Sequence, residues 1–361
     1  MRVGVITFHC SYNFGSVLQA WALTQQLCHM GHEPIIIDYR GENFRQYKLF
    51  DGRTAHDVLS NALFLRKNIG RKQAFEKFFS EHYSLSSRYE SGEEGKLTEL
   101  ANDFDCFVCG SDQIWNLDCT HGPVGPYFLS FAGGTRRVAY APSLARATFK
   151  EEYFGVKERA QIAEWLSKFS AISVREQTSV PLIAGLTDIP VEVCVDPTLL
   201  LDASDYLPIM GEAPLKENAL FLYMLSRNSR MLEYADWLAQ ELGLRIVYIG
   251  RRDIHFLAPS TNVYGIGPSE FLSQMAASSV VITNSFHATV FSLLFGKPFQ
   301  TFATEKSGSR MVDLLTSLGL EGHLVDGSSG ELPRPASASV LSKNLPSLKE
   351  KSLGFLSRAL S

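Results

Sequence analysis

The residues best suited to chemistry lie in the stretch 280–299, VVITNSFHATVFSLLFGKPF. Its apolar start predicts a buried parallel strand, its end predicts a helix, and Asn284, Ser285 and His287 stand between the two. Ligands of open α/β sheets bind beyond the carboxyl ends of strands, and the amino end of a helix attracts anions. His287 is the member of this group that exchanges a proton near neutral pH. We therefore expect a catalytic acid or base here, the alternative being a core histidine bonded to a neighbour.

A second polar group follows the apolar run FDCFVC, which predicts another buried strand. Gly110 allows close approach of the backbone. Asp112 can accept a proton or bind a sugar hydroxyl, and capping a helix is its alternative role. Ser111 and Gln113 add a hydroxyl and an amide, and the ring of Trp115 suits stacking on a sugar. Together these residues predict a site for a sugar substrate.

The loop HCSYNFGS follows the first predicted strand and precedes a helix expected over 16–30. It lacks the GxGxxG pattern, so the dinucleotide fingerprint is absent. Asn13, Gly15 and Ser16 nevertheless stand where backbone N–H groups can meet an anion or the oxygens of a substrate. A helix cap with a glycine for a tight turn explains these residues equally well.

Arginines at predicted strand ends are candidates for binding an anionic substrate. Arg175 follows a short apolar run, and its guanidinium can hold a carboxylate or phosphate in bidentate fashion. An ion pair with Glu176 or a neighbouring acid is an equally good explanation. Arg251 and Arg252 end another predicted strand, where they can clamp an anion or remain solvated.

A further anion site is predicted at the start of a helix expected over 311–318. Ser307 and Arg310 precede that helix, within the run SGSR. Serine hydroxyls, a glycine and the free N–H groups of a helix start suit a phosphate or carboxylate.

Strands and helices alternate twice along the chain, once on each side of a linker over 202–218. The alternation predicts an α/β protein with two Rossmann-like domains whose parallel sheets face a cleft. We expect an N-terminal domain over 1–200 and a C-terminal domain over 201–335. A tail over 336–361 ends in a helix that can pack back on the first domain.

A basic helical insertion is predicted at about 40–90, within the N-terminal domain. Its lysines and arginines are interleaved with leucines and phenylalanines, and such a surface can rest on an anionic membrane face or meet a phosphorylated acceptor. A solvated helix pair with its apolar side on the sheet explains the same pattern and is the interpretation we favour.

Composition narrows the class of protein. The 361 residues are 45% hydrophobic and 20% charged, as in globular chains, and a net charge of −4 does not favour nucleic acid as a partner. No apolar run reaches the ~18 residues of a membrane helix, and the amino terminus resembles a first strand more than a signal, so we expect a cytoplasmic protein. Cys106 and Cys109 form a CxxC that we interpret as buried core thiols, and no metal site is predicted.

Several segments, in order along the chain, resemble the polysaccharide pyruvyl transferase family: NFGSVLQAWAL, FVCGSDQIWN, VAYAPSLA, ISVRE, VDPTLL and NSFHATVFSLLFGKPF. The resemblance covers most of the chain and implies a fold similar to the two-domain GT-B arrangement of glycosyltransferases. It also implies transfer of pyruvate from phosphoenolpyruvate to a sugar as a cyclic ketal, on a cell-surface polysaccharide or its lipid-linked precursor. Phosphoenolpyruvate is then the donor substrate, and no cofactor is implied.

The family's histidine maps onto His287 through the SFH match, and Asp112 is the alternative base. Some members place an arginine two residues before that histidine, where this chain has Ser285, so another cation must hold the donor. The candidates are Arg175, Arg251, Arg252, Lys306 and Arg310. The rest of the expected donor site is Asn284, Ser285 and Ser307. The expected acceptor site is Asn13, Gly15, Ser16, Gly110, Ser111, Gln113 and Trp115.

Two other functions stay open. The chain can be a GT-B glycosyltransferase that uses a nucleotide sugar, because fold does not fix function. It can also be a non-catalytic protein of envelope assembly with a degenerate site. Whether the acceptor is lipid-linked, and whether the protein contacts the inner face of the membrane, are likewise open.

Overall fold

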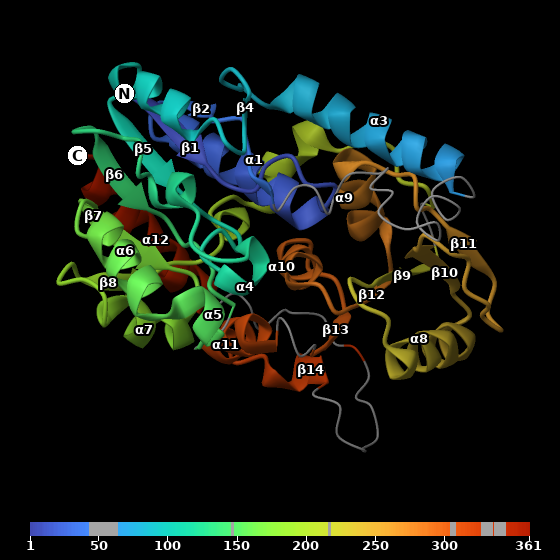
Figure 1. Ribbon diagram of the computed structural model, residues 1–361. Helices are drawn as coiled ribbons and strands as arrows, with labels where there is room; N and C mark the ends of the chain where they lie inside the picture. The colour runs from blue at the N-terminus through green and yellow to red at the C-terminus, as the bar shows by residue number, and fades with distance from the viewer. Residues whose placement is uncertain (43–63, 146–147, 216–217, 304–307, 326–334, 336–343) are drawn as a thin grey trace. The chain divides into compact units, whose positions relative to one another are not determined.

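The computed structural model describes the chain except for residues 43–63, 146–147, 216–217, 304–307, 326–334 and 336–343 (Figure 1). The described residues divide into two compact units. Unit 1 consists of those within Met1–Lys48, His82–Leu201 and Pro346–Ser361. Unit 2 consists of those within Leu49–Glu81 and Asp202–Leu345. Each unit therefore combines segments that are far apart in the sequence.

Unit 1 is built on a six-stranded parallel sheet with the order β2-β1-β5-β6-β7-β8. After β2 the chain crosses to the other side of β1 to form β5, so the strand order reverses between β1 and β5. In open α/β sheets this switch point is where ligands bind. The strands are β1 Arg2–Ile6, β2 Glu33–Ile36, β5 Cys106–Cys109, β6 Arg136–Ala139, β7 Ala171–Val174 and β8 Val191–Val193, with a separate pair, β3 Tyr39–Arg40 and β4 Tyr89–Glu90.

Both faces of this sheet are buried, as expected for parallel strands. Along β5, Cys106 packs in a cluster with Phe355 and Leu356 of the C-terminal helix, whereas Phe107 packs on the other face, edge-on to Phe131. The C-terminal helix α12 is therefore part of the core of unit 1. The helices are α1 Phe14–His29, α4 Leu117–Thr120, α5 Glu151–Phe154, α6 Val156–Leu166, α7 Val180–Ala184 and α12 Leu345–Leu360, with short 3-10 helices at Glu94–Asn102, Gly125–Phe128, Gln177–Ser179 and Pro197–Leu199.

The CxxC cysteines both lie on β5. Cys106 and Cys109 are fully buried and free, and burial raises the pKa of each thiol. The interpretation as core thiols is confirmed.

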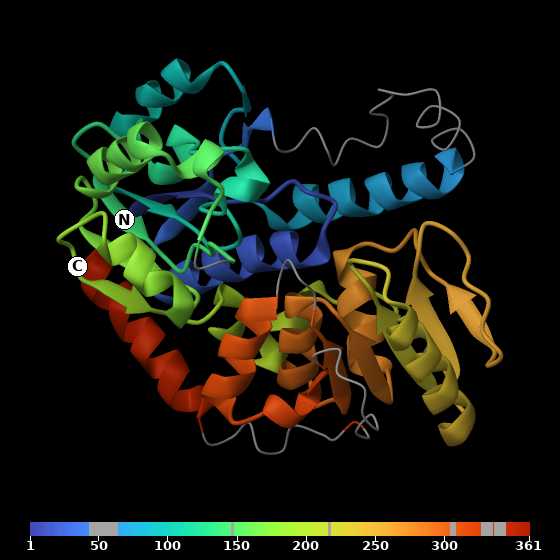
Figure 2. The same ribbon diagram turned by 60° about the horizontal axis from the view of Figure 1, so that its bottom comes forward.

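Unit 2 also has a six-stranded parallel sheet, with the order β11-β10-β9-β12-β13-β14. In chain order this is the Rossmann arrangement 3-2-1-4-5-6, and its switch point lies between β9 and β12. Helix α8 Ser229–Leu242, drawn in gold in Figure 2, packs against this sheet. The strands are β9 Ala219–Tyr223, β10 Arg245–Ile249, β11 Ser260–Asn262, β12 Val280–Thr283, β13 Phe299–Phe302 and β14 Leu324–Val325. The helices are α3 Leu65–His82, α8 Ser229–Leu242, α9 Pro268–Ala277, α10 Phe286–Leu294 and α11 Gly308–Leu318, with 3-10 helices at Ala203–Ile209 and Glu321–His323.

Helix α3, the described part of the expected basic insertion, belongs to unit 2 up to Glu81 and not to the N-terminal domain. Arg71 lies between the rings of Phe75 and Tyr264, with 4.9 and 5.1 Å from its guanidinium carbon to the ring centres. Tyr264 also donates from its hydroxyl to Asn68. These contacts attach the helix through its buried face and leave its lysines exposed. Within the described residues, no helix combines the length and apolar character needed to cross a membrane.

Candidate active site

The switch point of unit 2 holds the polar group that follows β12. Asn284 is fully buried, and its side-chain oxygen accepts from the N–H of Leu225 at 2.7 Å. Its amide nitrogen donates to the main-chain oxygen of Ser226, also at 2.7 Å. Asn284 therefore ties the loop after β9 to the loop after β12. Both ends of its amide serve this link, and binding of the donor by Asn284 remains a prediction.

His287 lies in the first turn of α10, and Ser285 is the N-cap of that helix. The Ser285 hydroxyl oxygen accepts from the N–H of Ala288 at 3.4 Å. His287 is 7% exposed, and its ring meets the ring of Phe286 edge-on, with 5.2 Å between the centroids. The histidine is thus held at the amino end of a helix, where the helix dipole favours a negative ligand.

Arg310 reaches the same aromatic ring from the next helix. Its guanidinium carbon is 5.6 Å from the centre of the Phe286 ring, within the range of a cation–π contact, and the residue is 5% exposed. Helices α10 and α11 follow the neighbouring parallel strands β12 and β13, so both begin at the carboxyl edge of the sheet. Phe286 thereby brings together a proton-exchanging group and a permanent cation. Among the five cations proposed for the donor, Arg310 is the one that contacts the histidine-bearing turn in the described part of the chain.

The other proposed donor cations of unit 2 stand elsewhere. Arg251 and Arg252 are exposed beyond β10, and Arg251 lies over the ring of Phe64 at 5.1 Å. Strand β9 separates β10 from β12. Lys306 and Ser307 fall outside the described residues.

In unit 1, Arg175 is a buried structural cation. It forms an ion pair with Asp196 at 2.8 Å, and it donates from Nε to the hydroxyl of Ser111 at 3.1 Å. Asp196 in turn accepts from the main chain and the hydroxyl of Thr198. These contacts give Arg175 a structural role, and binding of the donor by Arg175 remains a prediction. The neighbouring acid is Asp196 and not Glu176.

The turn after β5 is shaped by close packing. A Cβ atom on Gly110, at φ +118°, would stand 2.0 Å from the main-chain oxygen of Tyr140. Ser111 is fully buried and donates from its hydroxyl to the main-chain oxygen of Ala141. Asp112 has a left-handed backbone with φ 58° and is 4% exposed. Gly110 and Ser111 therefore build the turn that holds Asp112.

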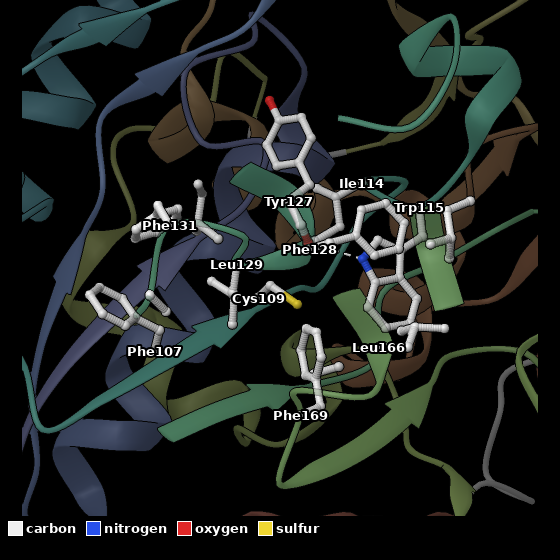
Figure 3. Packing of buried hydrophobic residues seen from close by; sticks show 14 of the residues in the cluster. Phe107, Cys109, Ile114, Trp115, Tyr127, Phe128, Leu129, Phe131, Leu166 and Phe169 are labelled. Atoms are coloured by element: carbon white, nitrogen blue, oxygen red, sulfur yellow. Dashed lines mark hydrogen bonds between the residues drawn. The ribbon is translucent and has the colours of Figure 1, made fainter. Parts of the chain in front are cut away.

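Trp115 lies in the hydrophobic core of unit 1 (Figure 3). Its ring is stacked on Phe128 with 5.1 Å between centroids, meets Phe169 edge-on, and donates from Nε1 to the main-chain oxygen of Tyr127. The expectation that Trp115 stacks on a sugar is wrong, because other side chains of the core cover it. Gln113 lies at the half-buried edge of this turn and accepts from the amide of Asn116.

The loop before α1 is a helix cap. Asn13 accepts at its side-chain oxygen from the N–H groups of Gly15 and Ser16, at 2.9 and 3.3 Å. Those N–H groups are engaged within the protein, so the capping explanation holds. A role of these residues toward an acceptor remains a prediction.

A polar cluster that the sequence analysis missed follows β1 and β2. His9 is buried, with Nε2 3.0 Å from Asp38 Oδ1 and Nδ1 3.2 Å from the main-chain oxygen of Thr7. A carbonyl and a carboxylate both accept, so the two contacts require a doubly protonated ring. Burial opposes this charge, but Cys10 and Asp38 outweigh burial and raise the pKa of His9 to about 10.

This cluster does not fit a metal ion. His9, Cys10 and Asp38 offer ligand atoms within 4.8 Å of one another. The Asp38 carboxylate, however, already accepts from Arg40 at 2.8 Å and from Arg88 at 3.3 Å. A cation would have to displace two arginines and the proton of an imidazolium. The signal that could have revealed the cluster was that His9 and Asp38 both stand close to the carboxyl ends of neighbouring strands, β1 and β2.

Two Rossmann-like units with parallel sheets define the GT-B class of fold. The chain is similar to an alpha-glucosyltransferase in complex with UDP, with a TM-score of 0.53, 9% identity, and coverage of 99% of this chain and 93% of that chain. It is also similar to a UDP-GlcNAc 2-epimerase from Neisseria meningitidis bound to UDP-GlcNAc, with a TM-score of 0.53, 11% identity, and coverage of 100% and 99%. At such identities the likeness concerns the fold alone.

Within that class the sequence identifies the family. Residues 13–305 match the polysaccharide pyruvyl transferase family, and the chain belongs to it. No curated protein matches the chain. The chain is therefore a transferase-family protein with a role in polysaccharide modification.

Proposed function

We propose that the protein transfers pyruvate from phosphoenolpyruvate to two hydroxyls of a sugar, forming a cyclic ketal during biosynthesis of a cell-surface polysaccharide. The observation that carries the proposal is the contact of His287 and Arg310 with the one ring of Phe286. The reaction needs a group that moves a proton and a cation for an anionic donor, and this arrangement supplies both. The family supports transfer of a pyruvyl group.

The proposed chemistry balances without a cofactor. His287, as the imidazolium, gives a proton to the methylene carbon of phosphoenolpyruvate, which becomes a methyl group. The neighbouring carbon becomes electrophilic and is attacked by a sugar hydroxyl, whose proton returns to the imidazole of His287. The bond from this carbon to the phosphate oxygen breaks, a second hydroxyl closes the ketal, and inorganic phosphate leaves with the remaining proton. General acid–base help of this kind contributes ~10²–10⁴-fold.

Arg310 and two helix starts are proposed to hold the negative charge of the donor. The guanidinium binds a carboxylate or phosphate through a fork of N–H groups. The amino ends of α10 and α11 add partial positive charge at the same edge of the sheet. Arg310 thus takes the place of the arginine that some family members have at the position of Ser285.

The acceptor is proposed to be a sugar unit of a polysaccharide precursor, at the cytoplasmic side. A lipid-linked acceptor would bring the protein to the inner face of the membrane. We propose that the exposed lysines of α3 contact the anionic surface there. Asp112 is proposed as a ligand for acceptor hydroxyls and as the alternative base.

Titration calorimetry with phosphoenolpyruvate, UDP-glucose and UDP-GlcNAc tests the donor. We expect phosphoenolpyruvate to bind and Arg310→Ala to weaken binding by about tenfold or more, with partial recovery in Arg310→Lys. Arg358→Ala is the control, because Arg358 is an exposed arginine of unit 1 paired with Glu192. Binding of a UDP-sugar in preference to phosphoenolpyruvate would establish the glycosyltransferase alternative instead.

A further inference from the structure

Two buried polar atoms without a partner stand at the switch point of unit 1. They are the hydroxyl oxygen of Ser11 and the Oδ2 atom of Asp112. Both are shielded from water, and neither has a hydrogen-bond partner among the described residues. Ser11 is 0% exposed and Asp112 is 4% exposed. Buried polar groups are normally bonded, so two such atoms in the segments after neighbouring strands require an explanation.

Their position is where the fold favours a ligand. Ser11 lies in the loop after β1, and Asp112 lies in the turn after β5. These strands are parallel neighbours, and the strand order reverses between them. The two loops are also tied together, because Thr7 donates to the main-chain oxygen of Ser111 at 3.1 Å and Gln19 accepts from the N–H of Ser111 at 3.1 Å. In α/β sheets of this kind, ligands bind at such a reversal.

The carboxylate of Asp112 is held in place by its surroundings. Its Oδ1 atom accepts from the N–H of Gln113 at 2.8 Å, and its main-chain oxygen accepts from the N–H of Ser143 at 2.7 Å. The preceding residue, Ser111, is fixed by Arg175, which is itself paired with Asp196. With one oxygen bonded and the backbone fixed, the direction of Oδ2 is set before any ligand arrives.

The hydrogen-bonding capacity of the two atoms indicates the class of ligand. An ionised carboxylate oxygen only accepts hydrogen bonds, whereas a serine hydroxyl both donates and accepts. A ligand with two hydroxyls can therefore form hydrogen bonds with both atoms. A metal ion fits less well, because the cluster of possible metal ligands among the described residues consists of His9, Cys10 and Asp38 and does not include Asp112.

We propose that Ser11 and Asp112 form the subsite for the hydroxyl pair of the acceptor sugar. The inference rests on the proposed function, in which two hydroxyls of one sugar become the ketal oxygens. Because both atoms are covered, a sugar reaches them through a local movement of the loop after β1 beyond Thr7, which leaves the bonds of Thr7 and Gln19 to Ser111 intact. That movement breaks no hydrogen bond of Ser11 Oγ or Asp112 Oδ2, since neither atom makes one.

Binding of methyl glycosides of glucose, galactose and mannose, followed by saturation-transfer NMR, tests the subsite. Ser11→Ala removes only a hydroxyl without a partner, and Asp112→Asn keeps the acceptor for Gln113 with a residue that tolerates a left-handed backbone. Ser173→Ala is the matched control, because this buried serine of unit 1 has a hydroxyl that bonds to Ala139 and Ala141.

We expect at least one glycoside to bind the wild type, and both site variants to weaken it by about tenfold while Ser173→Ala does not. Phosphoenolpyruvate, titrated separately, should bind Ser11→Ala as it binds the wild type. Glycoside binding that is unchanged in both variants, or absent from the wild type, overturns the subsite. Failure of phosphoenolpyruvate to bind, with the glycoside pattern intact, overturns the proposed donor and leaves the subsite standing.

Discussion

Arg175 and Asp196 form a buried ion pair across the ends of β7 and β8, with 2.8 Å between Nη2 and Oδ2. Their side chains are 3% and 0% exposed. Removing one member leaves the other charge buried, and we expect Arg175→Ala to lower the free energy of unfolding by about 3–5 kcal/mol. Urea denaturation measures the change.

The pair of Arg358 and Glu192 is the control for this experiment. It has nearly the same N–O distance, 2.9 Å, but its side chains are 64% and 34% exposed. Solvent screens such a pair, so Arg358→Ala should change stability by only ~0–1 kcal/mol. Equal losses in the two variants would contradict the structural role of Arg175.

A comparison of Gly110→Ala with Gly122→Ala measures the effect of close packing at the turn that holds Asp112. Both have a positive φ, +118° and +113°, but a Cβ on Gly122 would meet nothing within 4 Å. Gly122→Ala should cost about 1–3 kcal/mol through backbone strain alone. Gly110→Ala adds a clash with a carbonyl oxygen and should prevent stable folding, which soluble yield and thermal unfolding report. Similar stabilities for the two variants would contradict this account.

Loss of the hydroxyl should affect the free energy of unfolding differently at Ser11 and at Ser143. Ser143 donates to the buried carboxylate of Glu176, so Ser143→Ala should cost about 1–3 kcal/mol. Ser11→Ala removes a buried oxygen without a partner among the described residues, so it should leave stability unchanged or raise it. Chemical denaturation at neutral pH compares the two, and a marked loss in Ser11→Ala would show that its hydroxyl is structural.

The His9–Asp38 pair predicts a dependence of stability on pH. The pKa of His9 is raised from 6.5 to about 10 by Cys10 and Asp38, against the opposing effect of burial. A raised pKa in the folded state stabilises the protein fully below about pH 6.5, and the contribution is lost as the pH rises through about 10.

His9→Gln is the variant that tests this dependence. At pH 7 it should be less stable than the wild type by about 1–3 kcal/mol, because a neutral amide replaces the charged partner of Asp38. The difference should shrink as the pH approaches 10. Denaturation curves of both proteins across this range provide the measurement, and a difference that stays constant with pH would contradict a charged His9.

The sequence was sufficient to predict the fold class and the polar groups at strand ends. Alternating strands and helices predicted two Rossmann-like domains, and the carboxyl-end rule led to His287 and Asp112. The rule covers His9 and Asp38 as well, but the prediction for the loop after the first strand named Asn13, Gly15 and Ser16 instead. The basic helix was assigned to the N-terminal domain because it follows the first strands along the chain, whereas its buried Arg71 packs on Tyr264.

Other parts of the site depend on contacts that local spacing does not encode. Trp115 follows a polar turn, so it was expected at the surface, yet its ring stacks on Phe128 in the core. Arg175 follows β7, and its partner Asp196 follows the neighbouring strand β8, about twenty residues further along the chain. Arg310 was one of five possible cations until the Phe286 ring distinguished it.

Reaction in deuterated water tests the central claim most directly. The wild type is incubated with phosphoenolpyruvate and methyl glycosides, phosphate release is followed, and the product is examined by mass spectrometry and NMR. If His287 protonates the methylene carbon, the ketal methyl group of the product carries deuterium, and His287→Ala should lower the rate by about 10²-fold or more. Transfer by His287→Ala at the wild-type rate, or glycosyl transfer from a UDP-sugar without phosphate release from phosphoenolpyruvate, would contradict the account.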